Sequence, residues 1–360
     1  MSDTVPTVSV VTPVHNGGND FRQCLTSLAR ATPPPDELIV IADGDTDGSW
    51  RVAQEFGAKV IRLPQAGGPA RARNLGAQKA RGDILFFIDA DVAVAPDAIA
   101  QVKAIFAENP GLAAAFGSYD DAPAQPNFLS QYKNLLHHYV HQTGNEDAAT
   151  FWSGCGAIRR DVFLKMGGFD TGYPFPCIED IELGYRLKKQ GCKIRLHKTL
   201  QGKHLKHWGA VSLVKTDVLR RALPWTELIL RDRQVANDLN LDSSNRASVL
   251  AVFSLLALLP TTLLAGLTGL SIWPILALTA LALASFLLVI NAPVYRFFWR
   301  KRGLKFALQA IPWHWFYFLY GGLAFVAGLA LHRLRQWGLT RITFLPLESA
   351  DPLPSLKSEI

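Results

Sequence analysis

The chain is poor in the residues on which small metal-bound or disulfide-bonded frameworks depend. It has four cysteines in 360 residues, and none of them form a C-x-x-C spacing. This argues against a zinc ribbon or a disulfide scaffold. An apolar leader is also missing, because the start is largely polar and the apolar run from Val8 ends at Pro13. We therefore expect no signal peptide, and reduced thiols that face the cytosol.

Charge is missing from a long stretch of the second half. No charged residue occurs between Arg246 and Arg296, and this stretch holds the apolar segments Val249–Leu270 and Ile272–Ala292. Each is close to the ~20 residues that a bilayer core requires. A third charge-free segment, Ile311–Leu331, has aromatic residues in its first turns, as expected at a headgroup boundary. Globular cores rarely need such runs, so we predict about three transmembrane helices in residues 247–332.

The net charge of +7 is concentrated beside the apolar segments. Nucleic-acid binding is one interpretation, but basic residues next to membrane spans more often mark the cytoplasmic side and anionic headgroups. We expect no nucleic-acid partner. The basic residues are Arg186, Lys188, Lys189, Lys193, Arg195, Lys198, Lys203 and Lys206 before the membrane region, and Arg296, Arg300, Lys301, Arg302 and Lys305 in a loop between the second and third spans.

Short apolar runs alternate with amphipathic stretches in the first third of the chain. Near-continuous apolar strands separated by helices predict an α/β fold, a Rossmann-like, mostly parallel sheet covered on both faces. Ligands of such sheets bind beyond the carboxyl ends of the strands. The expected strands are residues 8–11, 38–41, 59–63, 84–88 and 112–116, and the expected helices are 21–31, 50–56 and 70–79.

An acidic run follows the second expected strand. Asp43, Asp45 and Asp47 match the opening of an EF-hand loop, but the twelfth position is Gln54 and the run follows a strand, so a calcium loop is rejected. Asp43 is placed to accept hydrogen bonds from a nucleobase or ribose, as acids after a second strand do in nucleotide-binding sheets. For Asp45 and Asp47, plain solvation of the loop is the alternative.

Asp89-Ala90-Asp91 directly follows the apolar strand at residues 83–88. An isolated Asp-x-Asp is weak evidence because many occur by chance. Here the position raises its significance, since two carboxylates at a strand end offer hard oxygen ligands to Mg²⁺ or Mn²⁺ that also hold phosphate oxygens.

Taken together and in order, these motifs resemble the family 2 glycosyltransferases, which have the GT-A fold; the resemblance covers roughly Pro6 to Ser212. It implies that Pro13, Asn16, Asp43 and Arg73 bind the nucleotide-sugar. It is carried by Val8-Ser9-Val10-Val11-Thr12-Pro13 with Asn16, Ala42-Asp43-Gly44, Gly68 to Arg73-Asn74-x-Gly76, Asp89-Ala90-Asp91, Gly167-Gly168-Phe169-Asp170 and Glu179-Asp180.

The same resemblance assigns Asp89 to the ribose or the metal-bound diphosphate, and Asp91 to the metal as its principal ligand. One departure concerns the base contact. The family often has two acids before the first glycine of the second motif, whereas this chain has Ala42-Asp43.

Glu179-Asp180 opens a segment of helical periodicity that runs to Gln190. On spacing alone, acids at a helix start are caps that complement the dipole. The resemblance instead implies the catalytic base, with Asp180 preferred and Glu179 second. A sugar hydroxyl is a poor nucleophile until a carboxylate takes its proton, so we expect direct displacement of the diphosphate with inversion.

Two further positions come from the resemblance. Trp152 lies in Phe151–Gly156, which is similar to the family's acceptor-side strand, where its ring either stacks on a sugar or fills the core. His204 and His207 are expected on a polar link after a strand near Lys193–Leu196. By resemblance, His207 completes the metal or phosphate site.

The class of acceptor is indicated by comparison with enzymes similar to this family. Processive synthases similar to this family carry Gln-x-x-Arg-Trp, whereas Gln309-Ala310-Ile311-Pro312-Trp313 lacks the arginine. A lipid or lipid-linked hydroxyl is therefore favoured, and a polyprenyl-phosphate sugar synthase is the runner-up, since its phosphate acceptor needs little general base. Nucleotidyl transfer and a catalytically inactive membrane-tethered binding protein are the rival classes.

The predicted organisation is a cytosolic catalytic domain at residues 1–210, an interfacial amphipathic linker at 211–246, a membrane region at 247–332 and a tail at 333–360. The protein is expected to be integral to the inner or plasma membrane, with its partners an NDP-sugar and a lipid-borne acceptor. Three crossings place His332, Arg333 and Arg335 outside, against the usual charge bias. The alternative is a re-entrant or interfacial third segment, which Pro312 permits.

Overall fold

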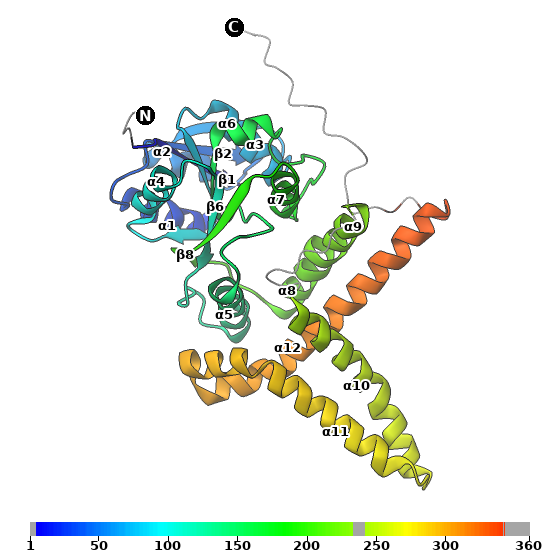
Figure 1. Ribbon diagram of the computed structural model, residues 1–360. Coiled ribbons are helices and arrows are strands. Elements are labelled where there is room, and N and C mark those ends of the chain that lie inside the picture. Colours follow the sequence, from blue (N-terminus) through cyan, green and yellow to red (C-terminus); the bar gives the residue numbers. More distant parts are fainter. Residues whose placement is uncertain (1–4, 233–241, 341, 343–360) are drawn as a thin grey trace. The chain divides into compact units, whose positions relative to one another are not determined.

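The computed structural model describes residues 5–232, 242–340 and 342, and the chain divides into two compact units at the boundary between Ala210 and Val211. The first unit contains a sheet and its covering helices, and the second is helical (Figure 1).

The first unit is built on an eight-stranded mixed sheet in the order β3-β2-β1-β4-β7-β6-β8-β5. The pairs β1/β2, β2/β3, β1/β4 and β6/β8 are parallel, and β4/β7, β6/β7 and β5/β8 are antiparallel. The five expected strands are confirmed. The strands are β1 (Val8–Val14), β2 (Glu37–Asp43), β3 (Lys59–Leu63), β4 (Ile84–Ile88), β5 (Val92–Val94), β6 (Leu112–Tyr119), β7 (Cys155–Arg159) and β8 (Lys193–His204).

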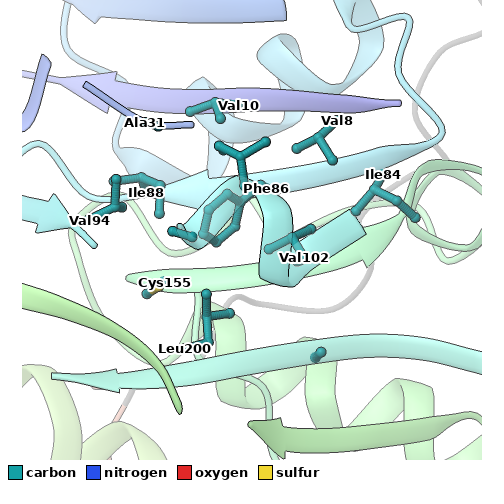
Figure 2. Close-up of a cluster of buried hydrophobic side chains, with 14 of the residues drawn as sticks. Val8, Val10, Ala31, Ile84, Phe86, Ile88, Val94, Val102, Cys155 and Leu200 are labelled. Atoms are coloured by element: carbon teal, nitrogen blue, oxygen red, sulfur yellow. The ribbon is translucent and has the colours of Figure 1, made fainter. Parts of the chain in front are cut away.

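Helices cover both faces of this sheet, which is why its central strands are apolar without alternation. All five residues of β4 are buried, and Figure 2 shows Phe86 among Val8, Val10 and Val102. Gly76 lets α3 approach closely, because a Cβ there would lie 2.4 Å from the Val11 side chain. The helices are α1 (Gly18–Ala29), α2 (Ser49–Glu55), α3 (Pro69–Lys79), α4 (Ala98–Glu108), α5 (Phe128–Thr143), α6 (Arg160–Lys165) and α7 (Glu179–Lys189).

Two expectations about local structure are wrong. Phe151–Gly154 is not a strand: β7 begins only at Cys155. His204 is not on a link after the eighth strand, because β8 continues to His204 and pairs there with β5, with His204 opposite Val92. The longer strand carries this imidazole to the edge of the sheet where Asp91 lies.

The second unit contains α8 (Ala210–Asp217), a π-helical turn η1 (Val218–Ala222), α9 (Leu223–Asp232), α10 (Ser243–Leu267), α11 (Trp273–Ile290) and α12 (Ala292–Gln336). Helices α10, α11 and α12 are each long and apolar enough to cross a membrane. The expected basic loop at 296–305 is instead part of α12, which bends at Gly303 with φ 82°. Residues 233–241 of the predicted linker, and the predicted tail beyond 342, lie outside the described residues.

Candidate active site

The two carboxylates of the Asp-x-Asp motif lie at the turn that joins β4 to β5. The Val92 N–H donates to the Asp89 carbonyl at 3.0 Å, and the Leu205 N–H donates to the Asp91 carbonyl at 2.9 Å, which fixes this turn against the end of β8. Both side chains remain partly open, with 32% of the Asp89 side chain and 28% of the Asp91 side chain exposed. They are therefore fixed in position and accessible to a ligand.

Arg73 of α3 lies beneath this turn and joins it to the start of α7. It is only 4% exposed, and its guanidinium donates to Asp89 Oδ1 at 2.6 Å and to Glu179 Oε1 at 2.8 Å. Burial alone would lower the pKa of Arg73, but the carboxylates of Asp89 and Glu179 outweigh burial and raise the pKa above its ordinary value. Arg73 thus forms two internal ion pairs, and its expected contact with the nucleotide stays a prediction.

The adjacent acids Glu179 and Asp180 have different surroundings. Glu179 is 3% exposed and both of its oxygens are used, since Oε1 accepts from Arg73 and Oε2 accepts from the Cys177 N–H at 2.9 Å. Asp180 is half-buried, and its Oδ2 accepts from the Ser153 N–H at 2.9 Å and the Ser153 hydroxyl at 3.1 Å. Burial, helped by the charge of Glu179, raises the pKa of Asp180 to about 6. Of the two, Asp180 is the group suited to exchange a proton near neutral pH.

The residues expected at the nucleotide base shape two neighbouring loops. Asp43 is buried, and its two oxygens accept from the Gly67 and Gly68 N–H groups, each at 2.8 Å. Asn16, with φ 52°, accepts from the Thr46 N–H through Oδ1 at 2.7 Å. Asp43 and Asn16 therefore tie the loops after β1, β2 and β3 together.

Pro13 lies inside β1, where it pairs with Ile41 of β2. At this register it is one residue before the end of the strand, so it belongs to the same sheet edge as Asp43.

Trp152 is half-buried in a cluster of rings. Its centroid lies 4.8 Å from both Tyr119 and His137, and 5.6 Å from His141. Gly154 lies directly under the indole, because a Cβ there would be 2.6 Å from the ring. These contacts hold the ring on several sides and account for its packing against the core.

The imidazole near the Asp-x-Asp motif belongs to His204, which the sequence analysis named but ranked behind His207 for the metal or phosphate site. His204 Nε2 lies 3.9 Å from Asp91 Oδ2, and its ring stacks on Tyr119 with a centroid distance of 4.1 Å. The His207 side chain is exposed. Only the antiparallel pairing of β8 with β5 brings His204 here, and no local motif reports that pairing.

The donor set is suited to a divalent cation shared with a ligand. Among the residues that the structure describes, no three His, Cys, Asp or Glu side chains gather as an all-protein metal site. Asp89 and Asp91 nonetheless present partly exposed carboxylates, which are hard donors of the kind that Mg²⁺ and Mn²⁺ prefer. They fit a metal that completes its coordination with phosphate oxygens and water.

Two family models match the first unit. Residues 9–167 match "Glycosyl transferase family 2", and residues 136–208 match "N-terminal domain of galactosyltransferase". Together they cover the Asp-x-Asp turn, Arg73, the Glu179-Asp180 pair and His204.

Curated relatives match over part of their length. An uncharacterized glycosyltransferase of Escherichia coli (strain K12), YibD, is 39% identical over 100 residues, which is 27% of this chain and 29% of the relative. A probable glycosyltransferase of Bacillus subtilis (strain 168), YdaM, is 28% identical over 207 residues, which is 53% of this chain and 49% of the relative. The chain thus spans less than half the length of these two relatives.

A solved structure shows the fold at greater coverage. The mannosyltransferase PcManGT from Pyrobaculum calidifontis, in complex with GDP-Man and Mn²⁺, superimposes with a TM-score of 0.57 at 18% identity over 85% of this chain and 86% of that one. At this identity the likeness concerns the fold alone. Residues 9–167 of the first unit therefore match the glycosyl transferase family 2 model, and the chain has a GT-A-like fold.

Proposed function

We propose that the protein is a metal-dependent, inverting glycosyltransferase that moves a sugar from an NDP-sugar to a hydroxyl of a lipid or lipid-linked acceptor. The observation that carries the proposal is the Arg73 bridge, which joins the Asp-x-Asp turn through Asp89 to the start of α7 through Glu179. One buried guanidinium thereby sets the donor-binding acids at a fixed spacing from the acid that follows Glu179.

The donor side is formed by Asp89 and Asp91, with His204 beside them. These two carboxylates would hold a Mg²⁺ or Mn²⁺ ion, which when bound would neutralise charge on the leaving diphosphate. Lys206, whose Nζ lies 3.8 Å from Asp91 Oδ2, adds positive charge at the same place. The nucleotide would lie across the loops tied together by Asp43 and Asn16.

Asp180 is the base of the proposed transfer. Its carboxylate takes the proton of the acceptor hydroxyl as the oxygen attacks the anomeric carbon, while the bond from that carbon to the diphosphate breaks. The products are the inverted glycoside, an NDP and protonated Asp180. Ser153 orients the carboxylate through its two hydrogen bonds to Oδ2, and Glu179 serves to position Arg73.

The raised pKa of Asp180 favours a hydroxyl acceptor over a polyprenyl phosphate. A phosphate oxygen is already ionised near neutral pH and gains little from a base, whereas a hydroxyl requires one. A carboxylate whose pKa is raised to about 6 is a stronger base than an ordinary aspartate and is still mostly ionised at pH 7.

The test is a screen of the purified protein in lipid against a panel of NDP-sugars, with NDP release measured with and without extracted membrane lipids. We expect one donor to give NDP release that lipid extract stimulates and that Asp180→Asn removes. Release of pyrophosphate from an NTP and a sugar phosphate would instead indicate nucleotidyl transfer. Stimulation by polyprenyl phosphate alone, unaffected by Asp180→Asn, would overturn the hydroxyl acceptor.

A further inference from the structure

The last helix is held to the first helices of the second unit by polar contacts along its C-terminal half. The Tyr320 hydroxyl donates to Asp217 Oδ2 at 2.8 Å, and Arg335 forms an ion pair with Glu227. Between these contacts, a Cβ on Gly328 would lie 2.9 Å from the Thr226 side chain. Residue numbers rise together on both partners, so α8–α9 and this part of α12 run parallel (Figure 1).

The contacts of α12 with the α10–α11 hairpin lie toward one end of that hairpin. A Cβ on Gly322 would lie 2.4 Å from Phe253 and 2.8 Å from Val249, both in the first half of α10. Phe318 shares a buried cluster with Leu255 and Leu287, which lie at the middle of α10 and in the last part of α11. The opposite end of the hairpin is an exposed apolar surface that includes Leu263, Leu267, Leu270, Ile272, Trp273 and Ile275.

The segment from α8 to α9 is unsuited to cross a bilayer. It carries charged residues throughout its length, and the charges of Asp217 and Glu227 are buried against α12. Charged groups at the bilayer centre are costly to insert, so such helices rarely cross. The charged residues are Lys215, Asp217, Arg220, Arg221, Glu227, Arg231 and Asp232.

Chain connectivity then determines where α12 ends. If α8–α9 stays on the side of the catalytic unit that precedes it, α10 leads across, α11 returns, and α12 begins on that side. Arg335 is paired with Glu227, so α12 also ends there. If α9 crossed instead, α12 would cross in the opposite direction to α9, whereas their contacts are parallel.

We propose that, of the described helices, only α10 and α11 cross the membrane. The part of α12 after the bend at Gly303 lies with α8–α9 on the leaflet facing the catalytic unit, against anionic headgroups. The part after the bend at Gly303 has exposed apolar residues, among them Leu304, Leu308, Phe316, Leu323, Phe325 and Val326. Basic residues flank it at Arg300–Arg302 and at Arg333 and Arg335. Apolar surface beside basic charge is the pattern of an interfacial helix. This arrangement replaces the expected three crossings and removes their conflict with the charge bias.

Cysteine labelling with a membrane-impermeant thiol reagent in intact cells tests the side of each helix end. Gln336→Cys reports the end of α12, Ser271→Cys reports the turn between α10 and α11, and the unsubstituted chain gives the background from native cysteines. We expect Ser271→Cys to label in intact cells and Gln336→Cys to label only after permeabilisation. Labelling of Gln336→Cys in intact cells, or protection of Ser271→Cys until permeabilisation, overturns the proposal.

A disulfide test examines the parallel packing directly. Thr226→Cys combined with Gly328→Cys would place two Cβ atoms 3.0 Å apart. This is slightly closer than the about 3.5–4.5 Å of a disulfide, so after a small separation of the helices mild oxidation of isolated membranes should join them. Thr226→Cys with the exposed Val326→Cys is the matched control and should stay unjoined. Failure of the first pair to join, or equal joining of both pairs, overturns the packing on which the side of α12 depends. NDP release by the same membranes tests the proposed enzyme activity separately.

Discussion

At the scale of single residues, Asp91 and Asp180 belong to the two ends of the Arg73 bridge. Asp91 follows Asp89 at one end, and Asp180 follows Glu179 at the other. We predict that Asp91→Ala weakens metal-dependent donor binding. Asp180→Asn should leave donor affinity nearly unchanged and lower turnover by at least about 10²-fold, as expected for a lost general base. Donor titration with and without Mn²⁺, together with NDP release, separates the two routes; equal loss of donor binding in both variants would contradict the roles.

The raised pKa of Asp180 predicts a pH dependence of turnover. The base acts only when ionised, so turnover at saturating donor should fall as pH drops through about 6, by about tenfold per pH unit below that value. An aspartate at its ordinary pKa would hold the rate to well below pH 5. A pH profile of NDP release measures this fall in turnover at low pH. The residual rate of Asp180→Asn should not show the fall.

The planar guanidinium of Arg73 pairs with two carboxylates at once. Lysine carries a single point charge on a flexible stem and does not reproduce a fork between Asp89 and Glu179. We expect Arg73→Lys to lower both turnover and the thermal midpoint. Arg71→Lys, at an exposed position on the same helix, is the control and should change neither. A normal turnover in Arg73→Lys would show that the bridge does not position the site.

At the scale of elements, the distance between α7 and the loop before Trp152 places Asp180 against Ser153. Gly184 of α7 permits this close approach, because a Cβ there would lie 2.5 Å from the Phe151 nitrogen and 2.7 Å from the Thr150 carbonyl carbon. Ala normally stabilises a helix relative to Gly by about 1 kcal/mol, but overpacking against backbone costs about 1–3 kcal/mol. We therefore predict that Gly184→Ala lowers the free energy of unfolding and the turnover.

Denaturant unfolding of the solubilised protein measures the effect of Gly184→Ala. Gly111→Ala is the matched control, since a Cβ there has nothing within 4 Å. A gain in stability for Gly184→Ala would mean that α7 and the loop are free to move apart.

The elements that the sequence predicted well are those whose signal is local. The strands β1, β2 and β4 are largely buried and read as near-continuous apolar runs. The strand β7 lacks such a run, with Cys155 and Gly156 at its start, and β8 extends to His204 only because β5 offers a partner. Antiparallel pairing across a mixed sheet is a tertiary property, which explains why the sequence did not place His204 beside Asp91.

The residues of the candidate site likewise divide into those with a local sequence signal and those placed by tertiary contacts. Asp89 and Asp91 were predicted because they directly follow an apolar strand. The two ion pairs of Arg73 were not predicted, because they join residues separated by 16 and 106 positions. Glu179 and Asp180 are adjacent in sequence, and only their burial and hydrogen bonds distinguish the positioning acid from the candidate base.

At the scale of the whole molecule, an ion pair joins α9, near the start of the second unit, to the end of α12. Glu227 and Arg335 are separated along the chain by the entire α10–α11 hairpin, so their pairing fixes the end of α12. The Glu227 side chain is buried and the Arg335 side chain is 28% exposed, so removing either partner leaves the other charge without compensation at a partly buried site. Glu227→Arg and Arg335→Glu alone should therefore each lower the thermal midpoint of the detergent-solubilised protein.

The double variant decides between a specific pair and two independent effects. Glu227→Arg with Arg335→Glu restores opposite charges at the same two positions, so we expect its midpoint to recover most of the loss seen in the single variants. Arg333→Glu, an exposed neighbour on α12, is the control and should leave the midpoint nearly unchanged. If the losses of the two single variants simply add in the double variant, the two side chains do not interact, and the end of α12 is not held on the side of the catalytic unit by this pair.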